Sequence, residues 1–468
     1  MTFLARTQPE ASSKSRKAGP AKLTLWPLVA ATFFMVSGGT YGTEDIVHGA
    51  GYALAVLLLV LTPLLWSLPT TFMIGELASA LPAEGGYYAW VRRGLGDFWG
   101  FQEAWLSLAA SIFDMAIYPT LFVAYLVRLV PWFAVGHHGE FVALAVVVAC
   151  AGLNLAGIRV VGFTSLWFFF LLSAPFAVVV LMGPFKVGAL AHAHAAPVTS
   201  TIGLLGGSLI AMWNYMGWDN ASTIAHEVDR PQYTYPRAMI GAVIIVSLSY
   251  ILPVLAVRVT GLSPAAFETG SWADIAGLMV GDWLRVAVVV GGMIMGFGMF
   301  NALVMSYSRL PLAMAQDGML PGAFARLHPK TRAPWVAILA CAAGWALCLG
   351  LGFERLVTLD IMLYGGSLLL EFVTLVVLRI REPQLPRAFR VPGGLAGAVL
   401  AGVFPTLLLT LALFHSEHET VLGMNGLAFG ASIVLAGVVV CCAMRPLRRV
   451  RQPQAGGGKE PAEASAIS

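Results

Sequence analysis

The chain has 468 residues, of which 58% are hydrophobic and only 11% are charged, and its mean hydropathy is +0.79. Soluble domains are about half apolar and about a quarter charged, so this composition excludes a soluble globular protein and indicates an integral membrane protein. The formal net charge of +4 is small and calls for no nucleic-acid partner. The expected surroundings of this chain are a lipid bilayer.

Apolar runs long enough to cross a hydrocarbon core of about 30 Å predict an all-α fold with about twelve transmembrane helices. The polar segment 1–23 lacks the pattern of a cleavable signal and is expected to be an N-terminal tail. The segment 446–468 is expected to be a disordered C-terminal tail. In chain order the predicted helices lie at 24–48, 51–76, 97–131, 140–157, 161–185, 203–227, 236–259, 285–315, 333–351, 355–379, 396–414 and 424–444.

Lys and Arg are unevenly distributed over the predicted loops. With the N-terminus inside, all but five of the 28 lie on the cytoplasmic side. By the positive-inside rule, this asymmetry predicts a multi-pass protein of the cell (inner or plasma) membrane with both termini in the cytoplasm. The exceptions are Arg128, Lys186, Arg258, Arg285 and Arg355.

Polar, glycine-containing sequence interrupts two of the predicted helices. The first break is 37–45 (SGGTYGTED), in predicted helix 1, and the second is 214–220 (NYMGWDN), in predicted helix 6. Non-helical backbone at membrane depth is tolerated only where it is buried in protein or lines a water-filled cavity. We therefore expect the two breaks to mark a substrate site.

The spacing of the breaks predicts a five-plus-five inverted repeat. Five crossings separate the two breaks, so helices 1 and 6 run in opposite senses, as in secondary transporters with discontinuous helices. We expect the first repeat at 24–185, the second at 203–381, and two appended helices at 396–445.

Four carboxylates lie at the breaks or in mid-helix, with no Lys or Arg at a similar depth. A charge near the bilayer centre costs at least ~2.5–3.5 kcal/mol on insertion scales, so such acids need a reason. An uncompensated acidic cluster attracts cations, either protons or an organic amine. The four are Glu44, Asp45, Asp114 and Asp219.

Each of these acids also has a structural interpretation. Glu44 and Asp45 begin the half-helix after the first break, where acids act as caps. Asp114, with Tyr118 one turn away, could form a helix–helix hydrogen bond. Asp219 could bond the freed backbone donors of the second break, which Asn220 could also do. Glu103 and Glu371, in contrast, are expected to be solvated, ion-paired or structural.

Aromatic residues flank both breaks. Trp213 is either an ordinary core aromatic or a lid over the substrate. Aromatic walls suit a cation site, since a desolvated cation–π contact contributes ~1–2 kcal/mol. The predicted walls are Tyr41, Tyr118, Tyr215 and Trp218, and the residues Ser37, Gly38, Gly39 and Asn220 complete the predicted binding set.

The sequence gives no sign of a cofactor. Its five Cys lie in apolar helices without metal-ligand or disulfide spacing, and no nucleophile–base pair is visible. We therefore expect no cofactor, no metal and no enzymatic activity. The Cys residues are Cys150, Cys341, Cys348, Cys441 and Cys442.

At these motifs the chain resembles the amino acid–polyamine–organocation (APC) superfamily, and specifically its plant and protozoan polyamine uptake transporters. The resemblance spans about 24–392. The stretches that carry it are 36–39 (VSGG), Tyr41-Gly42, Glu44-Asp45, 82–87 (PAEGGY), 98–102 (FWGFQ), Asp114, Tyr118-Pro119, 218–220 (WDN), Glu227, 316–321 (QDGMLP), 370–372 (LEF) and 379–392.

The resemblance implies the five-plus-five (LeuT-like) fold, proton-driven uptake and a polyamine-like substrate. In the related arginine–agmatine antiporter, a Trp four residues before the Gly of helix 6 acts as a gate, and Trp213 before Gly217 fits that spacing. By motif position, the family's recognition residues on helices 1, 3 and 6 carry over to Glu44, Asp45, Asp114 and Asp219.

The leading hypothesis is a proton-coupled importer of diamines or polyamines such as putrescine. Glu44, Asp45 and Asp219 would hold one ammonium group, and Asp114 the other. Asp114 or Asp219 would carry the proton. The alternative is an amino-acid permease, or an amino acid/amine exchanger, in which the Gly38 and Gly39 amides bind a substrate carboxylate and the acids act only as caps.

Overall fold

The computed structural model is helical almost throughout. It describes residues 24–82, 85–157, 163–192, 204–220, 222, 228–416, 420–421 and 423–451. Within these residues, the strands Thr420–Val421 (β1) and Met424–Asn425 (β2) form a short antiparallel pair. Nine helical segments of the described chain are long and apolar enough to cross a membrane, as expected for an all-α membrane protein.

The helices follow the predicted apolar runs closely. In chain order they are α1 (Leu25–Val36), α2 (Glu44–Thr62), the π-helix η1 (Pro63–Ser67), α3 (Leu68–Ala80), α4 (Gly86–Leu95), α5 (Asp97–Leu129), η2 (Pro131–Ala134), α6 (His138–Leu155), α7 (Phe163–Met182), η3 (Gly183–Lys186), α8 (Leu204–Asn214), α9 (Pro231–Arg258), η5 (Pro264–Ala266), α10 (Trp272–Val280), α11 (Asp282–Gln316), α12 (Trp335–Ala346), α13 (Phe353–Arg381), α14 (Gly394–Ser416) and α15 (Gly426–Arg451).

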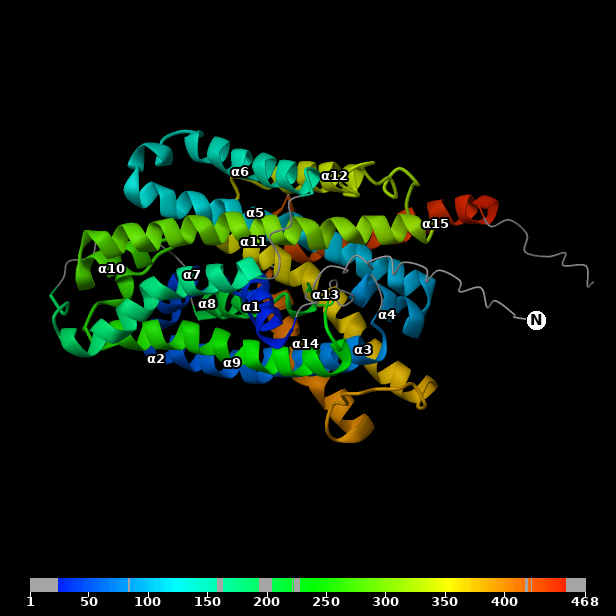
Figure 1. Ribbon diagram of the computed structural model, residues 1–468, viewed down its shortest axis with the longest axis horizontal. Helices are drawn as coiled ribbons and strands as arrows, with labels where there is room; N and C mark the ends of the chain where they lie inside the picture. The colour runs from blue at the N-terminus through cyan, green and yellow to red at the C-terminus, as the bar shows by residue number, and fades with distance from the viewer. Residues whose placement is uncertain are drawn as a thin grey trace, which may run out of the picture.

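Two short helices were not predicted, α4 and α10. Each precedes a long helix, α5 and α11 respectively. Each is much shorter than the apolar stretch that a transmembrane helix needs, so hydropathy alone does not predict it. They lie at opposite ends of the long helices, α10 on the left of Figure 1 and α4 on the right. These two ends of the molecule are called the α10 end and the α4 end below.

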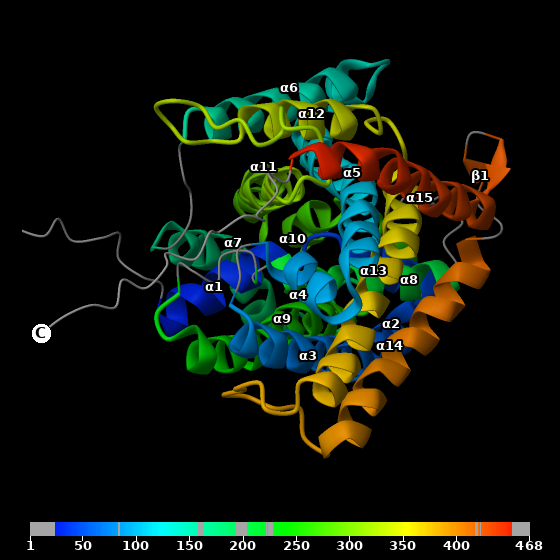
Figure 2. The same ribbon diagram turned by 90° about the vertical axis from the view of Figure 1, so that its right-hand side faces the viewer.

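Helices α1 and α8 end in the interior, between two layers of longer helices (Figure 1). Helix α5 packs against α11 and α13 on one side, while α1 packs against α9, and α8 packs against α2 and α13. Helices α6 and α12 lie together on the outside, and α14 and α15 cover one flank (Figure 2). Both breaks therefore open into the centre of the protein.

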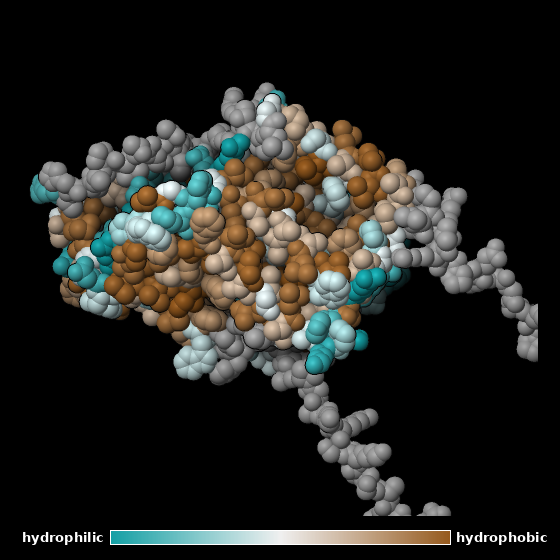
Figure 3. Space-filling model, turned by 90° about the horizontal axis from the view of Figure 1, so that it is seen from above, coloured by the Kyte–Doolittle hydropathy of each residue, from teal (hydrophilic) through white to brown (hydrophobic). Residues whose placement is uncertain are grey.

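Apolar side chains cover the middle of the face seen in Figure 3, and hydrophilic ones gather toward its two ends. Large apolar residues are freely exposed on several helices; Trp167, Leu181 and Val439 are 66%, 68% and 67% exposed. Such exposure is unfavourable in water and normal against lipid. The surface thus matches the membrane protein that the composition predicts. The count of twelve crossings and the inverted repeat remain predictions.

Candidate functional site

The first break adopts a conformation that glycine alone adopts readily. Gly38 and Gly39 have φ angles of 61° and 102°, in the left-handed region that L side chains rarely occupy. A Cβ atom at Gly38 would also lie 2.5 Å from the Met299 sulfur. The Ser37 hydroxyl accepts a hydrogen bond from the Gly39 amide at 3.0 Å, so a backbone donor that the break frees is bonded locally.

Buried aromatic donors satisfy the second break. The Tyr215 carbonyl accepts hydrogen bonds from the indole N–H groups of Trp66 (3.1 Å) and Trp218 (2.7 Å). The Tyr250 hydroxyl donates to the Asn214 carbonyl at 2.7 Å. These bonds replace the helical partners that the unwound carbonyls have lost. The structure thus places Tyr215 and Trp218 as supports of the break.

One side chain joins the two breaks. The Asn214 side-chain amide donates to the Gly42 carbonyl in the first break (3.2 Å) and to the Ile210 carbonyl in its own helix α8 (2.8 Å). The backbone leaves the helix immediately after Asn214 and reaches a φ of 83° at Gly217. The end of α8 is therefore bonded directly to the segment of the first break that leads into α2.

A small closed cavity lies where the breaks meet α5, α11 and α13. Its volume is about 20 Å³, which is room for a water molecule and far too little for a diamine. The structure is therefore a closed conformation of this site. The lining residues are Met35, Val36, Asp114, Tyr118, Trp213, Met216, Gly217, Asn220, Tyr307, Asp360 and Tyr364.

Asp114 is the most strongly hydrogen-bonded acid of the cavity. Its Oδ1 accepts from the Tyr118 hydroxyl at 2.9 Å and from the Trp213 indole N–H at 3.4 Å. Its Oδ2 accepts from the Tyr307 hydroxyl at 3.1 Å. All three donors come from aromatic side chains. The structure brings the predicted residues Asp114, Tyr118 and Trp213 together, and adds Tyr307.

Asp360, on α13, lines the same cavity as Asp114. Its side chain is 2% exposed, and its Oδ2 has no hydrogen-bond partner in the described part of the chain. It interacts electrostatically with both Asp114 and Asp219. Neighbouring buried carboxylates cannot all be ionised without a cation. Sequence analysis missed Asp360, because it lies near the start of its predicted apolar run, where an acid is expected to reach water.

Asp219 does not line the cavity itself, although its neighbour in the chain, Asn220, does. Its Oδ1 accepts from the Tyr364 hydroxyl at 2.6 Å, and Tyr364 itself lines the cavity. The next residue, Asn220, does line the cavity, and its Oδ1 accepts from the Ser306 hydroxyl at 3.2 Å. Asp219 can thus affect the cavity through the Tyr364 phenol, which sequence analysis did not select.

Glu44 and Asp45 lie elsewhere, toward the α10 end. Glu44 Oε1 accepts from the Tyr125 hydroxyl and from the Gly270 amide (3.1 Å), and Asp45 Oδ2 accepts from the Thr269 hydroxyl at 2.7 Å. On α5, Tyr125 is eleven residues beyond Asp114, which is about 16 Å along the helix. The predicted acidic cluster is therefore two separate groups.

The predicted wall residue Tyr41 belongs to this outer group. Its ring packs edge-to-face on Tyr125 and Phe176, with centroid distances of 5.1 and 5.0 Å. The nearest end of α5 carries Arg128, which pairs with Glu268 and Asp274. In the described ranges no ion pair reaches any of the five acids of the two groups, which are Glu44, Asp45, Asp114, Asp219 and Asp360.

Comparison with known proteins identifies the family. The family model described as amino acid permease matches residues 29–440. The chain belongs to the amino acid permease (APC) family. This permease is 33% identical over 437 residues to the polyamine transporter RMV1 of Arabidopsis thaliana, covering 91% of this chain and 85% of the relative. It is 34% identical over 418 residues to the polyamine transporter PUT1 of Oryza sativa subsp. japonica, covering 87% and 77%.

A bacterial relative is more distant. An uncharacterized transporter of Mycobacterium tuberculosis is 32% identical over 282 residues, which cover 57% of this permease and 60% of the relative. All of these proteins are named as transporters and none as an enzyme. The permease is accordingly a multi-pass membrane transporter of the APC kind.

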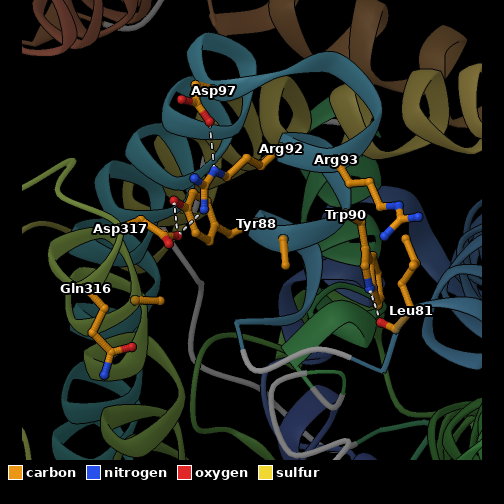
Figure 4. A pocket seen from close by; sticks show the side chains of 10 residues that line it. Leu81, Tyr88, Trp90, Arg92, Arg93, Asp97, Gln316 and Asp317 are labelled. Atoms are coloured by element: carbon orange, nitrogen blue, oxygen red, sulfur yellow. Dashed lines mark hydrogen bonds and ion pairs between the residues drawn. The ribbon is translucent and has the colours of Figure 1, made fainter. Parts of the chain in front are cut away.

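A second, larger cavity of this permease lies at the α4 end. It encloses about 530 Å³, and Figure 4 shows Arg92 between Asp97 and Asp317, with the Tyr88 hydroxyl also directed at Asp317. The Arg92 nitrogens lie 2.8 Å from Asp97 and 2.6 Å from Asp317, so they join α4 to the ends of α5 and α11. The two Arg and two Asp side chains of its wall balance in charge, and Arg92 is paired with both Asp residues.

The same end is held by a second ion pair. Arg93 lies 2.8 Å from Glu382, just beyond α13, and its hydrogen bond lowers the pKa of the Glu382 carboxyl. Gly94, also on α4, packs so closely on α13 that a Cβ atom there would lie 2.9 Å from the Thr374 methyl group. Helix α4 is therefore held firmly against α5, α11 and α13 at this end of the molecule.

Proposed function

We propose that this permease is a proton-coupled secondary transporter that imports diamines or polyamines, putrescine-like cations, by alternating access. The observation that carries the proposal is the group of three buried acids, Asp114, Asp219 and Asp360, around one aromatic-walled cavity without an ion-paired Lys or Arg. Such a site attracts a cation. The names of the relatives at 33% and 34% identity support the choice of polyamines.

The acids have different roles in this proposal. Asp114, with three donors, remains anionic and binds an ammonium group, while Tyr118 and Trp213 contact the methylene chain. Asp360 lines the cavity beside Asp114, and its Oδ2 has no hydrogen-bond partner in the described residues, so in this proposal it holds a proton when the cavity carries a substrate cation. Asp219 contributes through Tyr364 to the binding of the second ammonium. Compared with the sequence-based hypothesis, Asp360 joins Asp114 and Asp219 as a candidate proton carrier.

Alternating access is required because the cavity is closed. Trp213 packs edge-to-face on Phe353 at a centroid distance of 5.4 Å, and its ring lies 3.2 Å from the position of a Cβ on Gly42. It thereby covers the cavity on the side of the α10 end. We place the permease in the inner or plasma membrane with both termini in the cytoplasm. In this proposed orientation the α10 end faces the outside of the cell. Trp213 is then the outer gate.

One observation favours the alternative of an amino-acid permease: the matching family model is described as amino acid permease. Against this alternative, the Gly38 and Gly39 amides that would bind a substrate carboxylate already donate hydrogen bonds within the protein. The Gly38 amide donates to the Phe33 carbonyl at 3.3 Å, and the Gly39 amide donates to Ser37. A substrate carboxylate would have to displace these bonds and would also face the acids of the cavity.

Uptake of labelled putrescine into proteoliposomes tests the proposal. With an acidic exterior and a neutral lumen, we expect accumulation that a protonophore abolishes and that unlabelled spermidine inhibits. Leucine and arginine should not compete, because a carboxylate is repelled from the site. Accumulation of leucine or arginine, with no effect of putrescine, would overturn the proposal in favour of an amino-acid permease. Liposomes without protein provide the baseline.

A further inference from the structure

A second pair of buried acids lies between the central cavity and α4, and no role described above uses it. Glu103 on α5 and Glu371 on α13 are 0% and 1% exposed. Both carboxyl oxygens of Glu371, and Oε2 of Glu103, have no hydrogen-bond partner in the described part of the chain. Only Oε1 of Glu103 is bonded, to the Ser107 hydroxyl at 2.9 Å.

These glutamates repeat the arrangement of the cavity acids at another level. Glu103 precedes Asp114 by eleven residues on α5, and Glu371 follows Asp360 by eleven residues on α13. The two helices pack side by side and run in opposite directions (Figure 2), so both glutamates are displaced toward the α4 end by about 16 Å. The glutamate pair thus lies nearer the α4 end than the pair Asp114 and Asp360. Asp219 interacts electrostatically with an acid of each pair, Asp360 and Glu371.

No ion pair in the described structure neutralises this lower pair. Tyr87 of α4, 1% exposed, interacts electrostatically with Asp219, Glu103 and Glu371. The Arg residues at this end that form ion pairs have other partners: Arg379 and Arg387 pair with Glu76, Arg92 pairs with Asp97 and Asp317, and Arg93 pairs with Glu382. Helix α14 has no titratable side chain over 394–414.

The burial of Glu103 and Glu371 determines which cation the pair can bind. Two buried carboxylates that share a single hydrogen-bond donor and form no ion pair in the described structure are too costly to keep ionised in a membrane interior, so the pair must bind a cation or be protonated. Neither glutamate lines the central cavity or the cavity of Figure 4. A proton needs no cavity, whereas an ammonium group does.

We propose that Glu103 and Glu371 form a second proton-binding site, through which protons pass between Asp219 at the substrate cavity and the cytoplasm. The inference deepens the proposed function and rests on it. A proton leaves the carboxyl of Asp219 and is taken up by the carboxylate of Glu371; Tyr87 interacts electrostatically with both acids. The pair then releases a proton past α4, whose neighbouring Tyr88 lines the cavity of Figure 4 at the α4 end.

The test separates proton movement from amine movement in proteoliposomes of the full chain. Glu371→Gln and Glu103→Gln are compared with the wild type in two assays. One is putrescine accumulation driven by a pH gradient; the other is putrescine–putrescine counterflow at equal pH, which needs no net proton transfer. We expect putrescine accumulation by each variant to fall about tenfold relative to the wild type, which is a usual size for the coupling between two binding sites. The counterflow rate should stay within about twofold of the wild-type rate. Counterflow also reports that each variant is folded.

Matched controls and opposing outcomes complete the design. Glu140→Gln removes an exposed carboxyl near the start of α6, on the α10 end, and should change neither assay. A pH-sensitive dye in the lumen should show amine-induced acidification in the wild type and a loss of it in Glu371→Gln. Full accumulation and acidification in both Gln variants would overturn the inference alone. A wild type whose putrescine uptake ignores the pH gradient would overturn the proposed coupling itself.

Discussion

The two groups of acids next to the breaks contain the same residue types and differ in their partners. In the outer group, Glu44 and Asp45 accept hydrogen bonds from Tyr125, Gly270 and Thr269, which fix the half-helix of α2 to the loop before α10. In the central group, Asp114 and Asp360 line a cavity. Each group holds a buried carboxyl oxygen without a hydrogen-bond partner in the described chain, Glu44 Oε2 in the outer group and Asp360 Oδ2 in the central one, so the feature that separates the two groups is the cavity.

Asp114→Asn should have the largest effect on transport. The change removes the anion that binds the ammonium group and keeps the shape of the side chain. Loss of one partner of a buried charge pair costs about 2–5 kcal/mol, so putrescine uptake should fall by about 30-fold or more. Initial rates in proteoliposomes measure it, and Asp97→Asn, on the same helix but exposed, is the control. Uptake at the wild-type rate would remove the central group from the site.

Asp360→Asn should uncouple transport without preventing binding. The amide cannot carry a proton, and the anionic Asp114 remains. Gradient-driven accumulation should fall about tenfold, and the rate should lose its dependence on external pH. The measurement is accumulation against counterflow, as a function of pH. If the pH dependence persists, the proton carrier lies elsewhere, with Asp219 as the next candidate.

Tyr364→Phe should have an intermediate effect. It removes the hydroxyl that donates to Asp219 at 2.6 Å and changes little else in the cavity. A buried hydrogen bond contributes about 0.5–1.5 kcal/mol, so the KM for putrescine should rise about fivefold with a smaller change in the maximal rate. Tyr233→Phe is the control, because Tyr233 is 57% exposed. An unchanged KM would show that Asp219 acts independently of Tyr364.

Glu44→Gln should have the smallest effect on transport and a visible effect on stability. The amide keeps the shape but weakens the bonds to Tyr125 and Gly270, at a cost of about 1 kcal/mol. The KM should change by less than about twofold while thermal unfolding in detergent shifts to lower temperature. A tenfold rise in KM with unchanged stability would instead place the substrate at the outer group.

The breaks were predictable because their signals are local. Ser37-Gly38-Gly39 and Gly217 are read directly from the sequence, and the observed φ angles of the glycines are the reason these residues stand there. Asp114 was predictable for a similar reason, as an acid in the middle of a long apolar run. The family resemblance rests on the same stretches, and the match over 29–440 confirms it.

Other parts of the site depend on partners far away in the chain. The Glu44 carboxyl is held by Gly270, 226 residues later, and no local pattern predicts that contact. Asp360 lies five residues after the predicted start of its run at 355, where an acid is expected to reach water. In the structure α13 begins at Phe353 and Asp360 is buried among α5 and the second break. Burial by neighbours, and not depth in the run, made it part of the site.

The amide of Asn214 has a mechanical consequence. Because it bonds the carbonyl of Gly42 and that of Ile210 at once, a shift of either interrupted helix pulls on the other. In the proposed transport cycle, two half-helices tied in this way move together, so an entrance on one face of the membrane opens only as the other shuts. The proposed cycle thereby avoids a continuous aqueous pore, which would dissipate the ion gradient of the cell.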